Sequence, residues 1–262
     1  MGNSEAIILG IIQGLTEFLP VSSSGHLVIF QDILGVQEAG ITFEVMLHFG
    51  TLLSVIWVFG RDIIRLARDF RQGGQGRHFV LMLLLGIIPT GLMGILLKDA
   101  FESFYAQPLL TGIMLLLTGV ILFTLSRLTP GRKNERTMTA KDALLISVAQ
   151  GIAIIPGISR SGSTITAALW LGLDQQTAVK FSFLVSIPVI FGATLFELKD
   201  VLAFGFTGIN SSLVIGTLAS LFTGIFAIRI FVNLLQKGKF HYFAYYCWFA
   251  GAVTILYKIF FS

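Results

Sequence analysis

The 262-residue chain is 55% apolar and only 12% charged, which is about half of the roughly 25% charged residues usual in soluble domains. Together with a mean hydropathy of +0.85, this composition excludes a soluble globule. The net charge of +4 does not indicate nucleic-acid binding, because most Lys and Arg residues lie in short connectors between apolar runs. A single cysteine, Cys247, excludes an intrachain disulfide and a cysteine-rich metal site.

The first half of the chain begins with an apolar region, 6–34, that Pro, Gly and Ser residues interrupt in its middle. Such interruptions are typical of broken or re-entrant membrane segments, so this region predicts a helical hairpin. Three uninterrupted apolar runs follow, at about 43–59, 79–97 and 109–125. Each is close to the roughly 20 residues that a helix needs to cross a bilayer core.

The second half has the same order of segments. An interrupted region, 143–171, is followed by apolar runs at about 178–196, 211–235 and 242–261. The predicted fold class is therefore an all-α polytopic membrane protein with six transmembrane helices and two re-entrant helical hairpins.

The two interrupted regions match each other when position 13 is aligned with position 150 and the spacing is kept. This alignment places Gln13-Gly14 on Gln150-Gly151, Ser22 on Ser159, Ser24-Gly25 on Ser161-Gly162, and Leu34-Gly35 on Leu171-Gly172. Constant spacing over such a length indicates an internal repeat. We expect one membrane domain, 1–262, built from a repeat of about 1–126 and a repeat of about 142–262. Because each repeat would contain an odd number of crossings, the second is predicted to be inverted relative to the first.

The positive charges predict the orientation of the chain. Five Arg residues lie in 61–77 and five Lys or Arg residues in 127–141, so both connectors are predicted to be cytoplasmic. Connector 98–108 has one Lys and no Arg and is predicted to be external, while Lys237 and Lys239 place the last connector inside. These assignments agree if each hairpin enters and leaves on the same side of the membrane.

Chemically active side chains are concentrated in the first hairpin, around Pro20. Gln13 and Glu17 are four residues apart and share one helical face. Pro20 cannot donate a backbone hydrogen bond and would break the helix, so residues 22–25, Ser-Ser-Ser-Gly, are predicted to form a turn whose free N–H groups can bind an anion. His26 follows directly, in a position suited to proton transfer.

The second hairpin repeats this construction in Pro156-Gly157-Ile158-Ser159-Arg160-Ser161-Gly162-Ser163-Thr164. Arg160 adds a guanidinium, whose planar fork can donate two hydrogen bonds to one phosphate group. The two turns together therefore predict a phosphate site near the membrane midplane.

Simpler interpretations of these residues stay open. Ser and Gly often serve close helix packing, Glu17 and Arg160 can be each other's structural partners, and His26 can be a satisfied buried imidazole. An unpaired charge at membrane depth costs a few kcal/mol, which favours a functional role for Glu17 and Arg160. His48, one turn inside the 43–59 run, is ambiguous.

The motifs Gln13-x-x-x-Glu17, 20–26 and 156–164 resemble those of the bacterial undecaprenyl-diphosphatase family, which is associated with bacitracin resistance. The resemblance runs the full length of the chain, and where the family motif has Glu or Gln first, this chain has Gln13. It implies hydrolysis of undecaprenyl diphosphate to undecaprenyl phosphate and inorganic phosphate, which recycles the lipid carrier for cell-wall synthesis. It also implies an inverted-repeat helical fold in the bacterial inner membrane, with the active site open to the outer face.

The resemblance further implies roles for individual residues. Glu17, Ser23, His26 and Arg160 would be catalytic, with Ser23 and His26 as candidates for nucleophile and acid-base partner. Gln13 and Glu17 would serve a divalent cation, Mg or Ca, or a proton. Phosphate would be bound by Arg160 and Thr164. The two predicted turns add Ser22, Ser24, Gly25, Ser159, Ser161 and Gly162 as expected phosphate-binding residues. The chemistry does not by itself choose between water, Ser23 and His26 as the attacking group, and we favour Ser23.

The expected partners are undecaprenyl diphosphate and membrane lipids. Bacitracin would compete for the substrate, nucleic acid is not expected as a partner, and a homodimer is an open alternative. A competing interpretation is a polyprenyl-phosphate flippase or secondary transporter, because inverted repeats with broken helices also build transporters. A structural assembly partner would leave Glu17, His26 and Arg160 in the bilayer without a reason.

Overall fold

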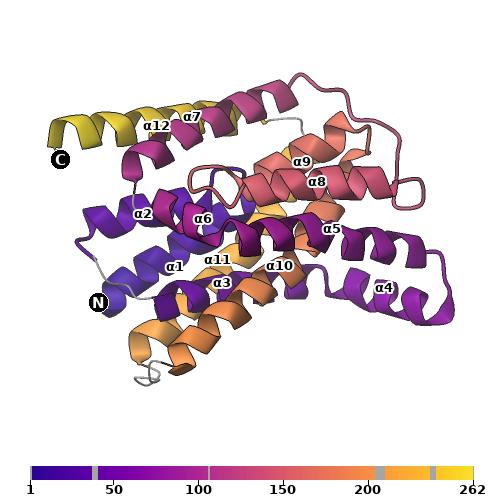
Figure 1. Ribbon diagram of the computed structural model, residues 1–262, viewed down its shortest axis with the longest axis horizontal. Coiled ribbons are helices and arrows are strands. Elements are labelled where there is room, and N and C mark those ends of the chain that lie inside the picture. The colour runs from indigo at the N-terminus through magenta and orange to yellow at the C-terminus, as the bar shows by residue number, and fades with distance from the viewer. Residues whose placement is uncertain (1, 37–40, 106, 204–209, 237–239, 262) are drawn as a thin grey trace.

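The computed structural model describes residues 2–36, 41–105, 107–203, 210–236 and 240–261, and these ranges contain twelve α-helices (Figure 1). The helices are α1 (Asn3–Phe18), α2 (Ser23–Ile33), α3 (Ile41–Val58), α4 (Gly60–Gln72), α5 (Arg77–Leu96), α6 (Lys98–Tyr105), α7 (Pro108–Leu125), α8 (Ala140–Ile152), α9 (Arg160–Trp170), α10 (Gln175–Ala203), α11 (Ser211–Gln236) and α12 (His241–Phe261). Within the same ranges, β pairing is limited to one isolated bridge between Lys133 and Leu173. The predicted all-α class is confirmed.

The six predicted apolar runs each fall on one helix, namely α3, α5, α7, α10, α11 and α12. Among the described residues, four helices are long and apolar enough to cross a membrane by themselves: Arg77–Leu96, Pro108–Leu125, Ser211–Leu234 and His241–Phe260. A fifth span results if α3 and α4, which meet at a bend of 72°, cross as one broken helix. The described chain thus has four or five candidate spans by length and composition, and Lys237 and Lys239 lie outside the described residues.

Two stretches that the sequence predicted only as connectors are partly helical, because they form α4 and α6. Charged residues stabilise α4 along one side: Arg65 pairs with Asp62 one turn earlier, at 3.6 Å. Gly73, with a φ of +70°, ends the helix in the left-handed conformation that glycine adopts without strain. A search for long apolar runs misses such polar helices.

Both predicted hairpins are broken where the sequence places the interruption. The first break begins at Leu19, which adopts an extended conformation with ψ of 144° before Pro20, as expected for a residue that precedes proline. Ser22 then caps α2, since its side chain accepts a hydrogen bond from the Gly25 N–H. The second break lies between α8 and α9, and Ser159 caps α9 in the same way through Gly162.

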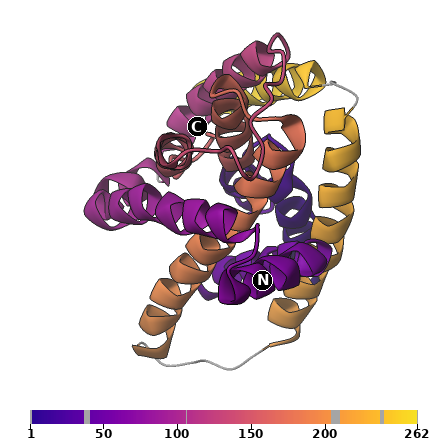
Figure 2. The ribbon, with the colours of Figure 1, turned by 90° about the vertical axis from the view of Figure 1, so that its right-hand side faces the viewer.

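The first helix of each hairpin packs on a helix from the other half of the chain. Helix α1 packs along α11 and α8 along α5, while α7 pairs with α12 and α3 with α10. In Figure 2 the indigo first hairpin lies beside the yellow-orange helix α11. Close approach of α1 and α11 depends on Gly14, because a Cβ there would meet the Ser220 carbonyl at 2.5 Å and the Gly224 nitrogen at 2.8 Å.

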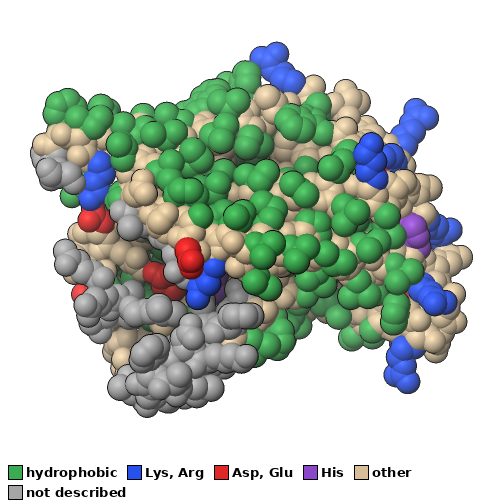
Figure 3. Space-filling view, in the orientation of Figure 1, with side chains coloured by type: hydrophobic (Ala, Val, Ile, Leu, Met, Phe, Trp, Pro, Cys, Tyr) green, Lys and Arg blue, Asp and Glu red, His purple; other side chains and the backbone are tan. Residues whose placement is uncertain are grey.

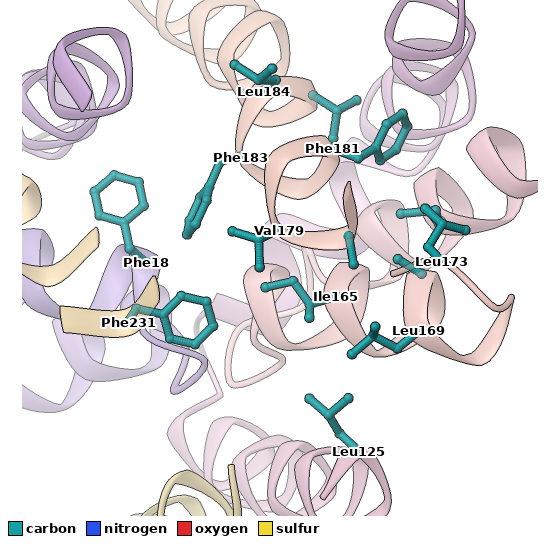
Figure 4. Packing of buried hydrophobic residues seen from close by; sticks show 14 of the residues in the cluster. Phe18, Leu125, Ile165, Leu169, Leu173, Val179, Phe181, Phe183, Leu184 and Phe231 are labelled. Atoms are coloured by element: carbon teal, nitrogen blue, oxygen red, sulfur yellow. The ribbon is translucent and has the colours of Figure 1, made fainter. Parts of the chain in front are cut away.

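Aromatic side chains fill the contact between the first hairpin, α10 and α11. Phe18 meets Phe183 at a centroid distance of 5.7 Å, and Phe183 meets Phe231 at 6.0 Å, both edge to face (Figure 4). Such pairs add to the energy of apolar burial. They hold the end of α1, and with it Glu17, against the two later helices.

The outward side of the helices is also apolar. Large side chains such as Trp57, Leu96 and Phe260 are 71%, 75% and 72% exposed. Figure 3 shows hydrophobic side chains over most of the middle of one face, with Lys and Arg side chains gathered mainly toward one end. A helix that is apolar on all sides needs a nonaqueous surrounding, so the structure is that of a multi-pass membrane protein.

Candidate active site

A cavity of about 270 Å³ lies where the two helix breaks meet. Its walls come from both hairpins and from α3, α5, α6 and α10. Six of the predicted site residues line it: Glu17, Ser22, Ser23, Ser24, Ser159 and Arg160. Two motifs from opposite halves of the sequence thus contribute polar side chains to one cavity, whose remaining lining includes apolar residues such as Ile154 and Val189.

The Glu17 carboxylate is the centre of this space. Its Oε1 accepts a 2.6 Å hydrogen bond from Arg160 Nη2, which is also an ion pair. Its Oε2 accepts a 2.6 Å bond from the Ser23 hydroxyl and a 3.1 Å bond from Gln13 Nε2. The side chain of Glu17 is only 7% exposed, so these three donors compensate for the loss of water around a buried charge.

Arg160 has a hydrogen-bond donor that the contact with Glu17 does not use. Its Nη1 is buried and has no hydrogen-bond partner among the described residues, although Nη2 holds Glu17. A guanidinium binds phosphate best when several N–H groups can point at the same anion. Arg160 would therefore have a second N–H group for a phosphate oxygen while its contact with the carboxylate persists.

The two turns are built alike, atom for atom, at their caps. The Ser22 hydroxyl accepts from the Gly25 N–H at 3.4 Å and lies 3.3 Å from the Ser24 hydroxyl. The Ser159 hydroxyl accepts from the Gly162 N–H at 3.1 Å and lies 3.3 Å from the Ser161 hydroxyl. The alignment of the two repeats also relates Ser23 to Arg160, so the two equivalent positions bind the two oxygens of one carboxylate.

The turns are also bound to each other. The Gly157 N–H donates to the Ser22 hydroxyl at 3.1 Å, and the Ser161 hydroxyl donates to the Leu19 carbonyl at 3.3 Å. Ser22 has a φ of +68°, which makes it the one described non-glycine residue with a positive φ. A backbone of this kind costs on the order of 1–3 kcal/mol and is kept only where the surroundings enforce it.

Four predicted phosphate-binding residues do not line the cavity. Gly25 and Gly162 lie against α7, since a Cβ there would come within 3.2 Å of Thr111 and of Leu122. Thr164 is fully buried, and its hydroxyl pairs with Arg160 O at 2.9 Å and with Ser182 Oγ at 2.6 Å. With Ser161 used between the hairpins, these residues position the turns, and sequence reasoning could not separate that task from direct phosphate contact.

His26 likewise lies outside the cavity lining, and it is 3% exposed. Its Nδ1 is 2.7 Å from the Ser22 carbonyl, and its Nε2 is 2.7 Å from the Tyr246 hydroxyl. The Ser23 hydroxyl is bonded to Glu17 instead. The expected pairing of Ser23 with His26 as its base is therefore not the one that the hydrogen bonds present.

Several cavity residues were not singled out from the sequence. His48 lies 3.8 Å from Glu17 Oε2, and its Nδ1 is 3.0 Å from Gln13 Nε2, which resolves its ambiguity in favour of the site. Gln150 donates to the Thr90 hydroxyl at 3.1 Å on the opposite wall. The internal repeat could have indicated Gln150, because it is the counterpart of Gln13. No feature of the sequence distinguishes Thr90 from other threonines in apolar runs.

A divalent cation has a partial set of ligands here. Among the described residues no group of three or more His, Cys, Asp and Glu side chains could hold a metal. The Gln13 Oε1 atom, however, is buried without a hydrogen-bond partner among the described residues, on a side chain whose amide nitrogen bonds the Glu17 carboxylate. Mg²⁺ and Ca²⁺ prefer such oxygen ligands, and the coordination of Mg²⁺ is commonly completed by substrate phosphates, so Gln13 and Glu17 would supply two of the oxygen ligands of such a cation.

Comparison with known proteins identifies relatives over nearly the whole chain. The family described as "Bacitracin resistance protein BacA" matches residues 6–253. The undecaprenyl-diphosphatase of Alkaliphilus metalliredigens is 45% identical, covering 99% of this chain and 100% of that protein. Those of Halothermothrix orenii, at 48% identity and 96% of both chains, and of Methanosphaera stadtmanae, at 39% identity and 97% of both chains, are similar along their full length as well.

Proposed function

The chain belongs to the bacitracin resistance protein family BacA, and from this premise we propose that it is a membrane phosphatase that hydrolyses undecaprenyl diphosphate to undecaprenyl phosphate and inorganic phosphate. The product is the lipid carrier of peptidoglycan synthesis, and its recycling counters bacitracin, which competes for the diphosphate. One observation on this chain supports the proposal most directly. The Ser23 hydroxyl, the Glu17 carboxylate and the Arg160 guanidinium meet in one cavity of a largely apolar helical bundle.

In the proposed reaction, Arg160 holds the terminal phosphate and Ser23 Oγ attacks its phosphorus. Glu17 accepts the Ser23 proton through the existing 2.6 Å hydrogen bond, and the bond from phosphorus to the bridging oxygen breaks, which releases undecaprenyl phosphate. Water then attacks the phosphorus of the phosphoserine and the bond from phosphorus to Ser23 Oγ breaks. The proton held by Glu17 returns to Ser23 Oγ, and inorganic phosphate leaves with the oxygen and the protons of the water. We choose Ser23 over His26 because Ser23 lines the cavity and His26 does not.

The cation of this proposal, Mg or Ca, would be held by Glu17 and by the side-chain amide oxygen of Gln13, and it would neutralise charge on the diphosphate. Gln13 Nε2 in turn lies between Glu17 Oε2 and His48 Nδ1. This pair of contacts keeps the amide nitrogen on the carboxylate and leaves its oxygen for a ligand.

We also propose the finer topology: α3, α5, α7, α10, α11 and α12 cross the bacterial inner membrane, and the hairpins α1–α2 and α8–α9 re-enter from opposite sides as two inverted repeats. The exchange of packing partners, α1 on α11 and α8 on α5, supports such a relation. Tyr105 of α6 lines the cavity and belongs to the connector with few positive charges, which supports a site open to the outer face.

The runner-up, a lipid-phosphate flippase or secondary transporter, has no comparable support. A serine hydroxyl that donates to a buried carboxylate is what an activated nucleophile requires. Translocation of an intact lipid phosphate has no need of this pair. Because transport needs two compartments and hydrolysis does not, an assay in detergent separates the two functions.

The test is phosphate release from undecaprenyl diphosphate by the purified protein in detergent, with Mg²⁺, with Ca²⁺ and with chelator. We expect turnover with the cation and its loss with chelator. Ser126→Ala serves as a matched serine control, since the Ser126 hydroxyl donates to the Phe123 carbonyl at the end of α7 and Ser126 does not line the cavity. A protein that is folded, cation-loaded and inactive toward this substrate would contradict the proposed function.

A further inference from the structure

His26 forms hydrogen bonds with the strained turn that precedes Ser23. The Ser22 carbonyl accepts two hydrogen bonds from this residue, one from Nδ1 at 2.7 Å and one from the backbone N–H at 3.2 Å. A carbonyl can only accept, so Nδ1 must carry a proton. The imidazole therefore supports the carbonyl of the residue whose φ is +68°, and the next residue along the chain is Ser23.

Tyr246 of α12 fixes this imidazole from the other side. Its hydroxyl is 2.7 Å from His26 Nε2, and its ring stacks on the imidazole at 5.6 Å with an interplanar angle of 10°. In the neutral imidazole Nε2 is the acceptor and the tyrosine O–H donates. A hydroxyl donor at Nε2 selects the tautomer that has its proton on Nδ1, which is the tautomer that the Ser22 carbonyl requires.

The next residue of α12 contacts the same turn. The Cys247 thiol is buried and donates to the Pro20 carbonyl at 3.7 Å, a weak bond but one that brings α12 directly against the break. Residues from opposite ends of the chain, 220 positions apart, thus meet behind the turn. The cavity lies on the other side of that turn, since Ser22, Ser23 and Ser24 line it and His26 does not.

We propose that Tyr246 is a positioning residue for the reaction, which acts through His26 and the Ser22 carbonyl to hold the Ser23 hydroxyl on Glu17. The inference rests on the proposed function. Tyr246 is not among the residues that line the cavity, so we expect its loss to affect the attack and not the binding of phosphate by Arg160. The expected signature is a lower kcat at nearly constant KM.

The experiment compares Tyr246→Phe and Tyr246→Leu with wild type in the detergent assay. Tyr246→Phe keeps the stacked ring and removes only the hydroxyl, and we expect its kcat to fall by about 3- to 10-fold, the range for one lost hydrogen bond. KM should stay within about 2-fold, and the thermal midpoint within about 3 °C of wild type. Tyr245→Phe is the matched control, because Tyr245 is adjacent on α12 but contacts His241 and Trp248, and it should behave as wild type.

A double-mutant cycle with His26→Asn tests the route of the effect. Tyr246→Phe should cause no further loss in that background, because the group through which it acts is gone. If Tyr246→Phe lowers kcat by the same factor in both backgrounds, the proposal is overturned. It is also overturned if Tyr246→Phe keeps the wild-type kcat and only Tyr246→Leu is defective, because the ring would then act by packing alone. A wild-type protein that releases no phosphate would overturn the proposed function and this inference together.

Discussion

Glu17 accepts hydrogen bonds from three different helices: from Gln13 on α1, from Ser23 on α2 and from Arg160 on α9. In a bilayer each of these groups would be costly to bury alone. Paired, they form a site that is ready for an anion, because Arg160 retains an unpaired buried nitrogen. At the scale of single residues, the carboxylate is thus both the structural centre and the proposed proton acceptor.

Removing the attacking hydroxyl or its carboxylate should abolish turnover. We expect Ser23→Ala to lower kcat by more than about 1,000-fold, as for other covalent nucleophiles, and Glu17→Gln by at least about 100-fold, as for a general base. Phosphate release by each variant at high enzyme concentration measures both. Substantial turnover by Ser23→Ala, or acid-labile and base-stable phosphate on His26, would assign the attack to another group.

The planar fork of Arg160 should matter beyond its charge. Lysine keeps the positive charge but cannot reach Glu17 Oε1 and a phosphate oxygen with separate, fixed N–H groups. We therefore expect Arg160→Lys to lose at least about 10-fold in kcat/KM, since a hydrogen bond to a charged group contributes about 1.5–3 kcal/mol. Near-normal turnover in this variant would mean that Arg160 serves only as a counter-charge to Glu17.

At the scale of the helices, the position of Glu17 depends on how closely α1 can approach α11. Gly14 lies between the two motif residues Gln13 and Glu17 and faces the backbone of Ser220 and Gly224. The close contact fixes the rotation of α1 about its axis. The side chains one residue before and three residues after Gly14 are thereby directed into the site.

Gly14→Ala should consequently lower stability and activity together. Its Cβ would meet backbone atoms that cannot move aside, and overpacking of this kind costs about 1–3 kcal/mol. Gly91→Ala is the matched control, because a Cβ at Gly91 on α5 meets nothing within 4 Å. The thermal midpoint in detergent is the measurement, and equal midpoints for the two variants would show that the α1–α11 contact can relax.

At the scale of the whole molecule, ionic contacts gather at the ends of helices and in the connectors that carry the positive charges. Lys180 of α10 bonds Asp62 at 2.6 Å and Glu135 at 2.8 Å, and Arg65 reaches the same Glu135 at 3.0 Å. Lys133 pairs with Asp142 at 2.9 Å, at the start of α8. The connector 127–139 is thereby bound to α4, α8 and α10, so the two connectors that are predicted to be cytoplasmic lie together.

Cysteine accessibility tests this orientation in a Cys247→Ala background. Arg132→Cys, in the positively charged connector, should resist a membrane-impermeant thiol reagent in intact cells and react after permeabilisation. Gln107→Cys, in the connector with few positive charges, should react in intact cells. The reverse labelling pattern would invert the proposed topology and place the cavity mouth inside.

The sequence alone determined that this is a helical membrane protein with two interrupted segments. Long apolar runs, Pro20 and the Ser-Gly turns act on the local backbone, so they can be recognised without knowing the tertiary structure. The sequence also identified Glu17, Ser23 and Arg160, since polar groups are conspicuous among apolar ones, and the internal repeat made the two turns equivalent.

The sequence did not show which side chains become hydrogen-bond partners or neighbours in the folded protein. That Ser23 bonds Glu17 and not His26 depends on the geometry of the helix break. That His48 lines the cavity, and that Thr164 faces Ser182 and not the cavity, depends on which helices touch after folding. Tyr246, 220 residues from His26, was indistinguishable in the sequence from other tyrosines of α12. Local chemistry selects the elements and the polar groups, whereas long-range packing between the two halves assigns each group its partner and hence its role.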